Sequence, residues 1–118
     1  MKLNAYDLRR TNVKVEEKKA VKKNDIYIIL DNVLDTYNVG AVFRLADAVG
    51  AKKIFLCGYT ETPPNTRIKK ASINTTEWVD WQHSKTAVSA IKNLKLKIKN
   101  LRVIAIEQSP KSIPYTEA

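Results

Sequence analysis

Cysteine, histidine and glycine are scarce in this sequence, and each scarcity excludes a class of site. Cys57 is the single cysteine, so an internal disulfide and a cysteine-based zinc site are both excluded. His83 is the single histidine, which argues against a metal site and a Ser-His-Asp arrangement, and we expect it in a capping or surface role. The chain also lacks the G-x-G-x-x-G pattern of dinucleotide-binding folds and the phosphate-binding G-x-x-x-x-G-K-[ST] loop.

Long apolar runs are missing as well. No stretch approaches the length of a membrane span, and residues 1–12 are too polar for the apolar core of a signal peptide. Together with the lone cysteine, this favours a cytoplasmic protein without a membrane partner. The composition, 44% hydrophobic and 28% charged, is typical of one globular domain.

Basic residues strongly outnumber acidic ones: 21 Lys and Arg stand against 12 Asp and Glu, a net charge of +9. An excess this large favours a polyanionic partner, with nucleic acid the first candidate and an anionic membrane surface the second. A solubilising lysine surface is the alternative. Residues 1–24 are basic and contain no strand-like run, so we expect a helical N-terminal arm there and a separate domain over 25–118.

After residue 24, strand-like and helix-like patterns alternate. Continuous apolar runs predict buried strands at 26–30, 53–57 and 101–106, with a shorter strand or edge segment at 78–81. Apolar residues at helical spacing predict helices over 38–49, 67–72 and 84–98, the last capped by Ser84. This order predicts an α/β domain with a mainly parallel, Rossmann-like sheet. Ligands of such sheets bind beyond the carboxyl ends of the strands.

The helix over 38–49 places one cation in a distinctive position. Arg44 lies opposite the apolar stripe, and helical side chains lean toward the N-terminus, so it is expected to reach back toward the loop after the first strand. Gly40 is expected to leave room for that approach, and Asn38 to cap the helix. From geometry alone, the favoured interpretation of Arg44 is a surface ion pair with Asp47.

The segment from Asn38 to Gly50 closely resembles the first motif of the SpoU/TrmH class of SPOUT RNA methyltransferases. The matching residues are Asn38, Gly40, Arg44, Ala46, Asp47 and Gly50. The resemblance extends from about residue 26 to residue 118. It implies a fold of the SPOUT (α/β knot) type and methyl transfer from S-adenosylmethionine to a ribose 2′-hydroxyl of tRNA or rRNA. It also implies a catalytic Arg44, a supporting Asn38 and a cofactor pocket lined by Ile106, Glu107, Gln108 and Ser109.

Two motifs that this family carries near its C-terminus are missing from the sequence. In the family they form most of the trefoil knot that holds the cofactor and much of the dimer interface. The resemblance therefore implies that residues 25–118 are the N-terminal part of a SPOUT methyltransferase domain. It also implies that this chain alone is inactive and that the full-length protein is a homodimer. A fragment, a truncated gene and a natural remnant that only binds RNA all fit these features.

Two groups of cations are candidates for contacts with RNA phosphates. One group, Arg9 and Arg10, lies in the N-terminal arm. The other group follows the loop after the second strand and consists of Arg67, Lys69 and Lys70. A solvated lysine face is the alternative for any one of them. For the whole chain, the alternative function is a non-catalytic, basic RNA-binding α/β module.

Overall fold

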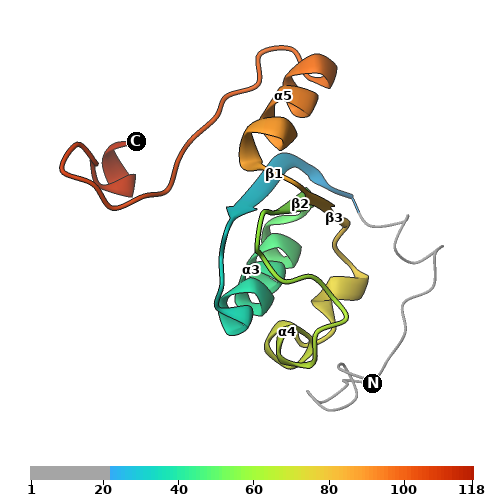
Figure 1. Ribbon diagram of the computed structural model, residues 1–118. Helices are drawn as coiled ribbons and strands as arrows, with labels where there is room; N and C mark the ends of the chain where they lie inside the picture. Colours follow the sequence, from blue (N-terminus) through green and yellow to red (C-terminus); the bar gives the residue numbers. More distant parts are fainter. Residues whose placement is uncertain (1–21) are drawn as a thin grey trace.

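Three parallel strands form one sheet in the part of the chain that the computed structural model describes, residues 22–118 (Figure 1). The strands lie in the order β1-β2-β3. In chain order the elements are β1 (Asn24–Asp31), α3 (Thr36–Val49), β2 (Ala51–Cys57), α4 (Thr66–Ser72), the 3-10 turn η1 (Thr75–Glu77), β3 (Trp81–Ser84), α5 (Ala87–Lys97) and the 3-10 turn η2 (Tyr115–Glu117). The prediction of a mainly parallel, Rossmann-like α/β fold is confirmed. Most of the expected arm over 1–24, with Arg9 and Arg10, lies outside the described residues.

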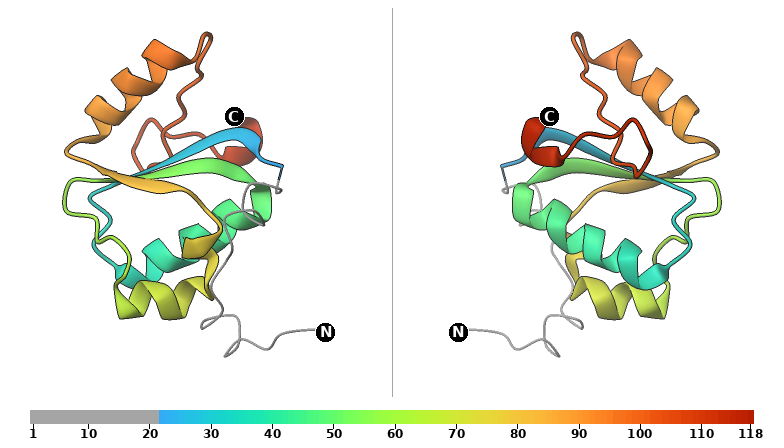
Figure 2. Two further views of the ribbon diagram at one scale, coloured as in Figure 1. Left: turned by 90° about the vertical axis from the view of Figure 1, so that its right-hand side faces the viewer. Right: turned by 90° about the vertical axis from the view of Figure 1, so that its left-hand side faces the viewer.

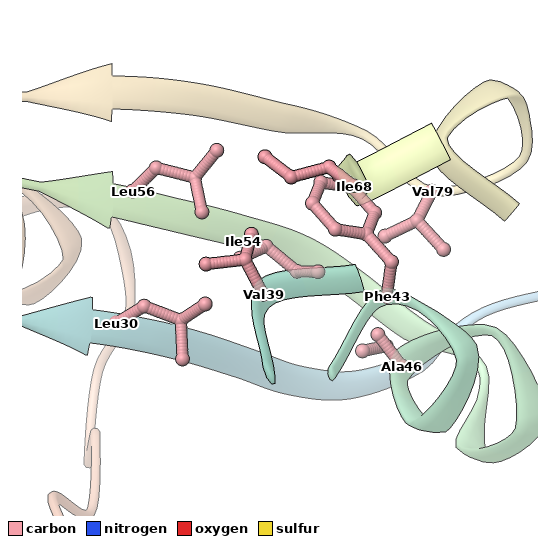
Figure 3. Packing of buried hydrophobic residues seen from close by; sticks show 9 residues of the cluster. Leu30, Val39, Phe43, Ala46, Ile54, Leu56, Ile68 and Val79 are labelled. Atoms are coloured by element: carbon pink, nitrogen blue, oxygen red, sulfur yellow. The ribbon is translucent and has the colours of Figure 1, made fainter. Parts of the chain in front are cut away.

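Helices cover both faces of the sheet: α3 and α4 lie on one face and α5 on the other (Figure 2). Side chains of β2 alternate between the two layers. Ile54 and Leu56 pack in the core under α3 and α4, with Phe43 of α3 fully buried among them (Figure 3). Phe55 and Cys57 pack under α5. This double cover explains the continuous apolar run of β2, because both of its faces are removed from water.

The first helix of the domain, α3, begins two residues earlier than expected. Asp35 is its N-cap, and its Oδ1 accepts hydrogen bonds from the backbone N–H of Tyr37 at 2.9 Å and of Asn38 at 3.3 Å. Asn38 therefore lies in the first turn, and its predicted role as the cap is wrong. At its other end α3 stops at Gly50, a left-handed C-cap with φ of 65°.

Replacing the cap by Asp35→Ala is expected to lower the free energy of unfolding by about 1 kcal/mol, because two amides at the start of α3 lose their acceptor. Asp35→Asn keeps a side-chain oxygen there and is the matched control, expected to stay within a few tenths of a kcal/mol of the wild type. Urea unfolding followed by circular dichroism measures both. Equal losses in the two variants would contradict this role of the cap.

The third strand and the helix after it also differ from the prediction. The strand was expected at 78–81, yet β3 runs from Trp81 to Ser84. Its polar residues gave no strand signal because β3 is an edge strand, and it is held by pairing with β2. Ser84 ends this strand, and the helix is capped instead by Thr86, whose hydroxyl accepts from the Ser89 N–H at 3.1 Å.

The predicted strand over 101–106 is wrong as well. This segment has no sheet partner in residues 22–118, and Figure 1 shows the chain after α5 running away from the sheet. Leu101 is half-buried against α5, while Val103 and Ile104 are more than half exposed. An apolar run has the composition of a strand, but strand formation also requires a neighbour that supplies hydrogen bonds.

Within residues 22–118 the longest helix is α3, with 14 residues, and no helix is long and apolar enough to cross a membrane.

Candidate active site

A hydrogen bond to the side chain of Asn32 connects the loops at the carboxyl ends of β1 and β2. Asn32 follows β1, has φ of 52°, and accepts a hydrogen bond at its Oδ1 from the Tyr59 N–H at 2.8 Å. Gly58 just after β2 has φ of 63°, and a Cβ there would overlap the Asn32 side chain. The close approach of these two loops therefore requires glycine at position 58.

Thr60 makes a second set of hydrogen bonds at the same edge of the sheet, and it was not predicted from the sequence. Its side chain is buried and donates to backbone carbonyls, with Oγ1 lying 3.2 Å from the Leu30 carbonyl oxygen and 2.8 Å from that of Cys57. The same hydroxyl accepts from the Val33 N–H at 3.0 Å. A polar residue three positions after a buried strand was the only sequence signal. These bonds fix the loop that leads into α3.

The edge strand β3 is joined to this edge through His83 and Ser84. The exposed His83 ring places Nε2 3.0 Å from the carbonyl oxygen of Gly58, and the Ser84 carbonyl accepts from the Gly58 N–H at 3.0 Å. This agrees with a surface role for His83. All three strand ends are thus held in one rigid edge, where parallel sheets place their ligands.

The structure places Asn38 and Arg44 on the same helix but on different flanks. Both are exposed. Six residues of helix separate them by about 9 Å along the axis and roughly 120° around it. Asn38 lies in the first turn of α3, beside the ordered edge of the sheet, and Arg44 lies farther along the helix. A site using both residues must therefore bind a ligand that extends along α3.

Arg44 has no ion pair and no side-chain hydrogen bond with any residue in the range 22–118. The interpretation of an ion pair with Asp47 is therefore wrong in this structure, although both side chains are exposed. A weak surface pair of this kind costs side-chain entropy and contributes little. No side chain among residues 22–118 therefore competes with an anionic ligand for this guanidinium.

Gly40 has a different role from the predicted one. It is buried, and a Cβ at this position would lie 2.5 Å from the Ala71 Cβ and 2.8 Å from the Ile68 carbonyl oxygen. Gly40 thus allows α3 and α4 to pack in close contact, rather than leaving room for Arg44. Its predicted function was wrong because α4 is distant in sequence and the contact is not local.

Through this contact, α4 brings further cations into the same layer as Arg44. Asn65 caps α4, accepting at its Oδ1 from the N–H groups of Arg67 at 2.9 Å and of Ile68 at 3.2 Å. The buried Ile68 packs in the core, while the exposed face of α4 presents Arg67, Lys69 and Lys70. This layer therefore carries four exposed cations when Arg44 is included.

The predicted cofactor segment does not form a pocket in this structure. Ile106 is fully exposed, and Glu107, Gln108 and Ser109 are exposed on the same extended tail. The polar contacts of these residues are local, such as the Gln108 N–H donating to the Glu107 carboxylate at 2.8 Å. The arrangement of residues 22–118 therefore does not fit an enclosed S-adenosylmethionine site.

Calorimetric titration of S-adenosylhomocysteine into the 118-residue chain is accordingly expected to show no saturable heat, because no part of residues 22–118 forms a wall opposite Ile106–Ser109. A saturable isotherm would mean that the tail closes over the sheet edge in solution. Ser109→Ala is the control in that case, since it removes a hydroxyl of the predicted pocket and is expected to weaken such binding.

Neither thiol nor metal chemistry is suggested by the described residues. Cys57 is buried beneath α5, and burial raises the pKa of its thiol, which disfavours the reactive thiolate. Residues 22–118 contain no cluster of three or more side chains that could hold a metal ion.

Comparison with known proteins identifies the family. A model of the SpoU rRNA methylase family matches residues 25–118. No curated protein matches. Among solved structures, the chain is similar to the SpoU methyltransferase AviRb from Streptomyces viridochromogenes, in complex with the cofactor AdoMet; the TM-score is 0.57 at 14% identity, over 71% of this chain and 31% of that chain. At this identity the likeness shows a common fold, and the chain spans less than a third of AviRb. Because the family model matches most of its length, the chain belongs to the SpoU rRNA methylase family.

Proposed function

We propose that the protein transfers a methyl group from S-adenosylmethionine to a ribose 2′-hydroxyl of tRNA or rRNA. Membership of a family of rRNA methylases and the fold shared with an AdoMet-bound methyltransferase support this proposal. The observation that carries it is the exposed Arg44, which has no pairing partner among residues 22–118, in the layer formed by α3 and α4 together with three further cations. Such a layer is suited to the phosphates of a substrate RNA.

Arg44 is proposed to act on the RNA as a cation, not as a base. A guanidinium stays protonated in proteins and so cannot accept the proton of the ribose hydroxyl. Its planar set of N–H donors can hold a phosphate and orient the neighbouring hydroxyl. The same positive charge would stabilise negative charge that develops on the attacking oxygen. Asn38, in the first turn of α3, would support this site from the ordered edge of the sheet.

S-adenosylmethionine would supply the methyl group, and elements other than residues 22–118 as the structure arranges them would be needed to enclose it. The exposed positions of Ile106, Glu107, Gln108 and Ser109 support this view, and no catalytic step is assigned to them.

A cytoplasmic homodimer is the proposed form of the full-length protein. The exposed Leu45 and Val49 on α3, 63% and 46% accessible, support an interface on this helix, because exposed apolar side chains on one helix favour association. Sedimentation of the full-length protein tests the dimer, and a monomer at micromolar concentration would overturn it.

A non-catalytic RNA-binding module is the second candidate, favoured by the open arrangement of the cofactor segment. Incubation of the full-length protein with RNA and S-adenosylmethionine carrying a tritiated methyl group separates the two functions. We expect label in RNA that increases over many turnovers. RNA binding without label would favour the binding module, and absence of both would contradict the proposed function.

A further inference from the structure

A groove of about 470 Å³ lies on the face of the sheet that α5 covers, away from α3 and α4. Its floor is formed by residues of all three strands and its wall by the second half of α5. The polar and aromatic lining residues are Tyr27, Lys52, Lys53, Phe55, Asp80, Gln82, Asn93 and Lys97. Because α5 starts after the carboxyl end of β3, its last turns lie over the amino-terminal halves of the strands. The groove is thus separate from the edge that carries Asn32 and Thr60.

Several side chains that line this groove carry hydrogen-bond donors that no other residue in the described part of the chain uses. Within residues 22–118, the side chains of Gln82, Asn93 and Lys97 have no hydrogen bond or ion pair. Lys53 is held over the Phe55 ring, with its Nζ 5.7 Å from the ring centroid, in a cation–π contact. That contact positions the ammonium group and leaves its N–H donors available.

The groove keeps a net positive charge when the ion pair formed by Lys52 is left out of the sum. Lys52 forms an ion pair with Asp25, and its hydrogen bond and charge lower the pKa of that carboxyl. Asp80, the carboxylate among the lining residues, has an interaction partner of its own. The two ammonium groups of Lys53 and Lys97 together exceed the single carboxylate charge of Asp80, and the amide side chains of Gln82 and Asn93 line the same groove. Two cations with neighbouring amide donors match the oxygens of a phosphodiester.

We infer that this groove binds a phosphodiester segment of the substrate RNA, as a second contact on the face of the sheet opposite Arg44. The inference rests on the proposed function, which makes RNA the substrate. A seven-residue strand such as β2 spans about 23 Å. The groove therefore contacts RNA several nucleotides away from the reacting ribose, and it is expected to contribute to affinity and KM rather than to kcat.

The double variant Lys53→Gln/Lys97→Gln tests this inference in the full-length protein. Fluorescence anisotropy with labelled, unfractionated tRNA measures affinity at several salt concentrations. We expect about tenfold weaker binding, and a smaller slope of log K against log salt by about 1.4 to 1.8, since two phosphate contacts are lost. The matched control is Lys92→Gln/Lys95→Gln, which removes the same charge from exposed positions of α5 that do not line the groove.

Three outcomes distinguish the inference about the groove from the proposed function. A larger loss of affinity in the groove variant than in the control, with kcat unchanged, supports the inference. Equal losses in both variants, or none, would mean that these lysines form a solvated surface, and would overturn the inference while the proposed function stands. Failure of the wild-type protein to bind tRNA or rRNA would overturn both. Circular dichroism and the urea midpoint confirm that each variant folds.

Discussion

Arg44→Ala is expected to lower the methyl-transfer rate of the full-length protein by about 10²- to 10³-fold, the usual cost of removing one donor that stabilises developing negative charge. The affinity for RNA is expected to change by less than about threefold, because Arg44 is one of several cations that would contact phosphates. Single-turnover rates at saturating RNA measure the first effect, and anisotropy measures the second.

Two further variants make this test specific. Arg44→Lys keeps the charge and loses the planar set of donors, so it is expected to recover little of the rate. Lys95→Ala removes an exposed cation from α5, on the other face of the sheet, and is expected to leave the rate unchanged. A parallel loss of rate and affinity in Arg44→Ala would mean that Arg44 binds RNA and has no separate role in methyl transfer.

Gly40→Ala is expected to lower the free energy of unfolding by about 2 kcal/mol, within the range for overpacked cores. The added methyl group would meet the Ala71 Cβ at 2.5 Å and the Ile68 carbonyl oxygen at 2.8 Å, so α3 and α4 must separate. Helix propensity alone predicts the opposite sign, since alanine stabilises a helix by about 1 kcal/mol relative to glycine. The sign of the change in the free energy of unfolding, measured by urea unfolding, therefore shows whether overpacking or helix propensity dominates.

The double variant Gly40→Ala/Ala71→Gly provides the control for this contact. Removing the Ala71 methyl group relieves the closest clash but not the one with the Ile68 carbonyl, so part of the loss is expected to return. A stabilised Gly40→Ala variant would contradict the close packing of α3 on α4. Any loss of activity in the single variant is expected to follow its loss of stability.

The strands and the first helix of the domain could be predicted because their signals are local. β1 and β2 are continuous apolar runs, and α3 combines an apolar stripe with a glycine at its C-cap. β3 was misplaced because Gln82 and His83 are polar, and only pairing with β2 holds them in a strand. The strand predicted over 101–106 does not form for the converse reason: its residues are strand-like, but no strand among residues 22–118 pairs with it.

The candidate site was predicted in part. Asn38 and Arg44 came from a resemblance to a family motif, and the family itself is confirmed by comparison; their catalytic roles, and those of the cofactor and RNA residues, remain predictions. Asn32 and Thr60 were missed, because hydrogen bonds between loops that follow different strands leave no periodic pattern in a sequence. The role of Gly40 was misassigned for the same reason, since its partner helix lies 26 residues later.

The position of the transferred methyl group shows whether the protein is a ribose 2′-O-methyltransferase. RNA labelled by the full-length protein with tritiated S-adenosylmethionine is hydrolysed in alkali, which cleaves next to a free 2′-hydroxyl but not next to a methylated one. We expect the label to remain in alkali-resistant dinucleotides and to appear on ribose when they are digested to nucleosides and analysed by mass spectrometry. Label released in mononucleotides, with the methyl group on a base, would contradict it.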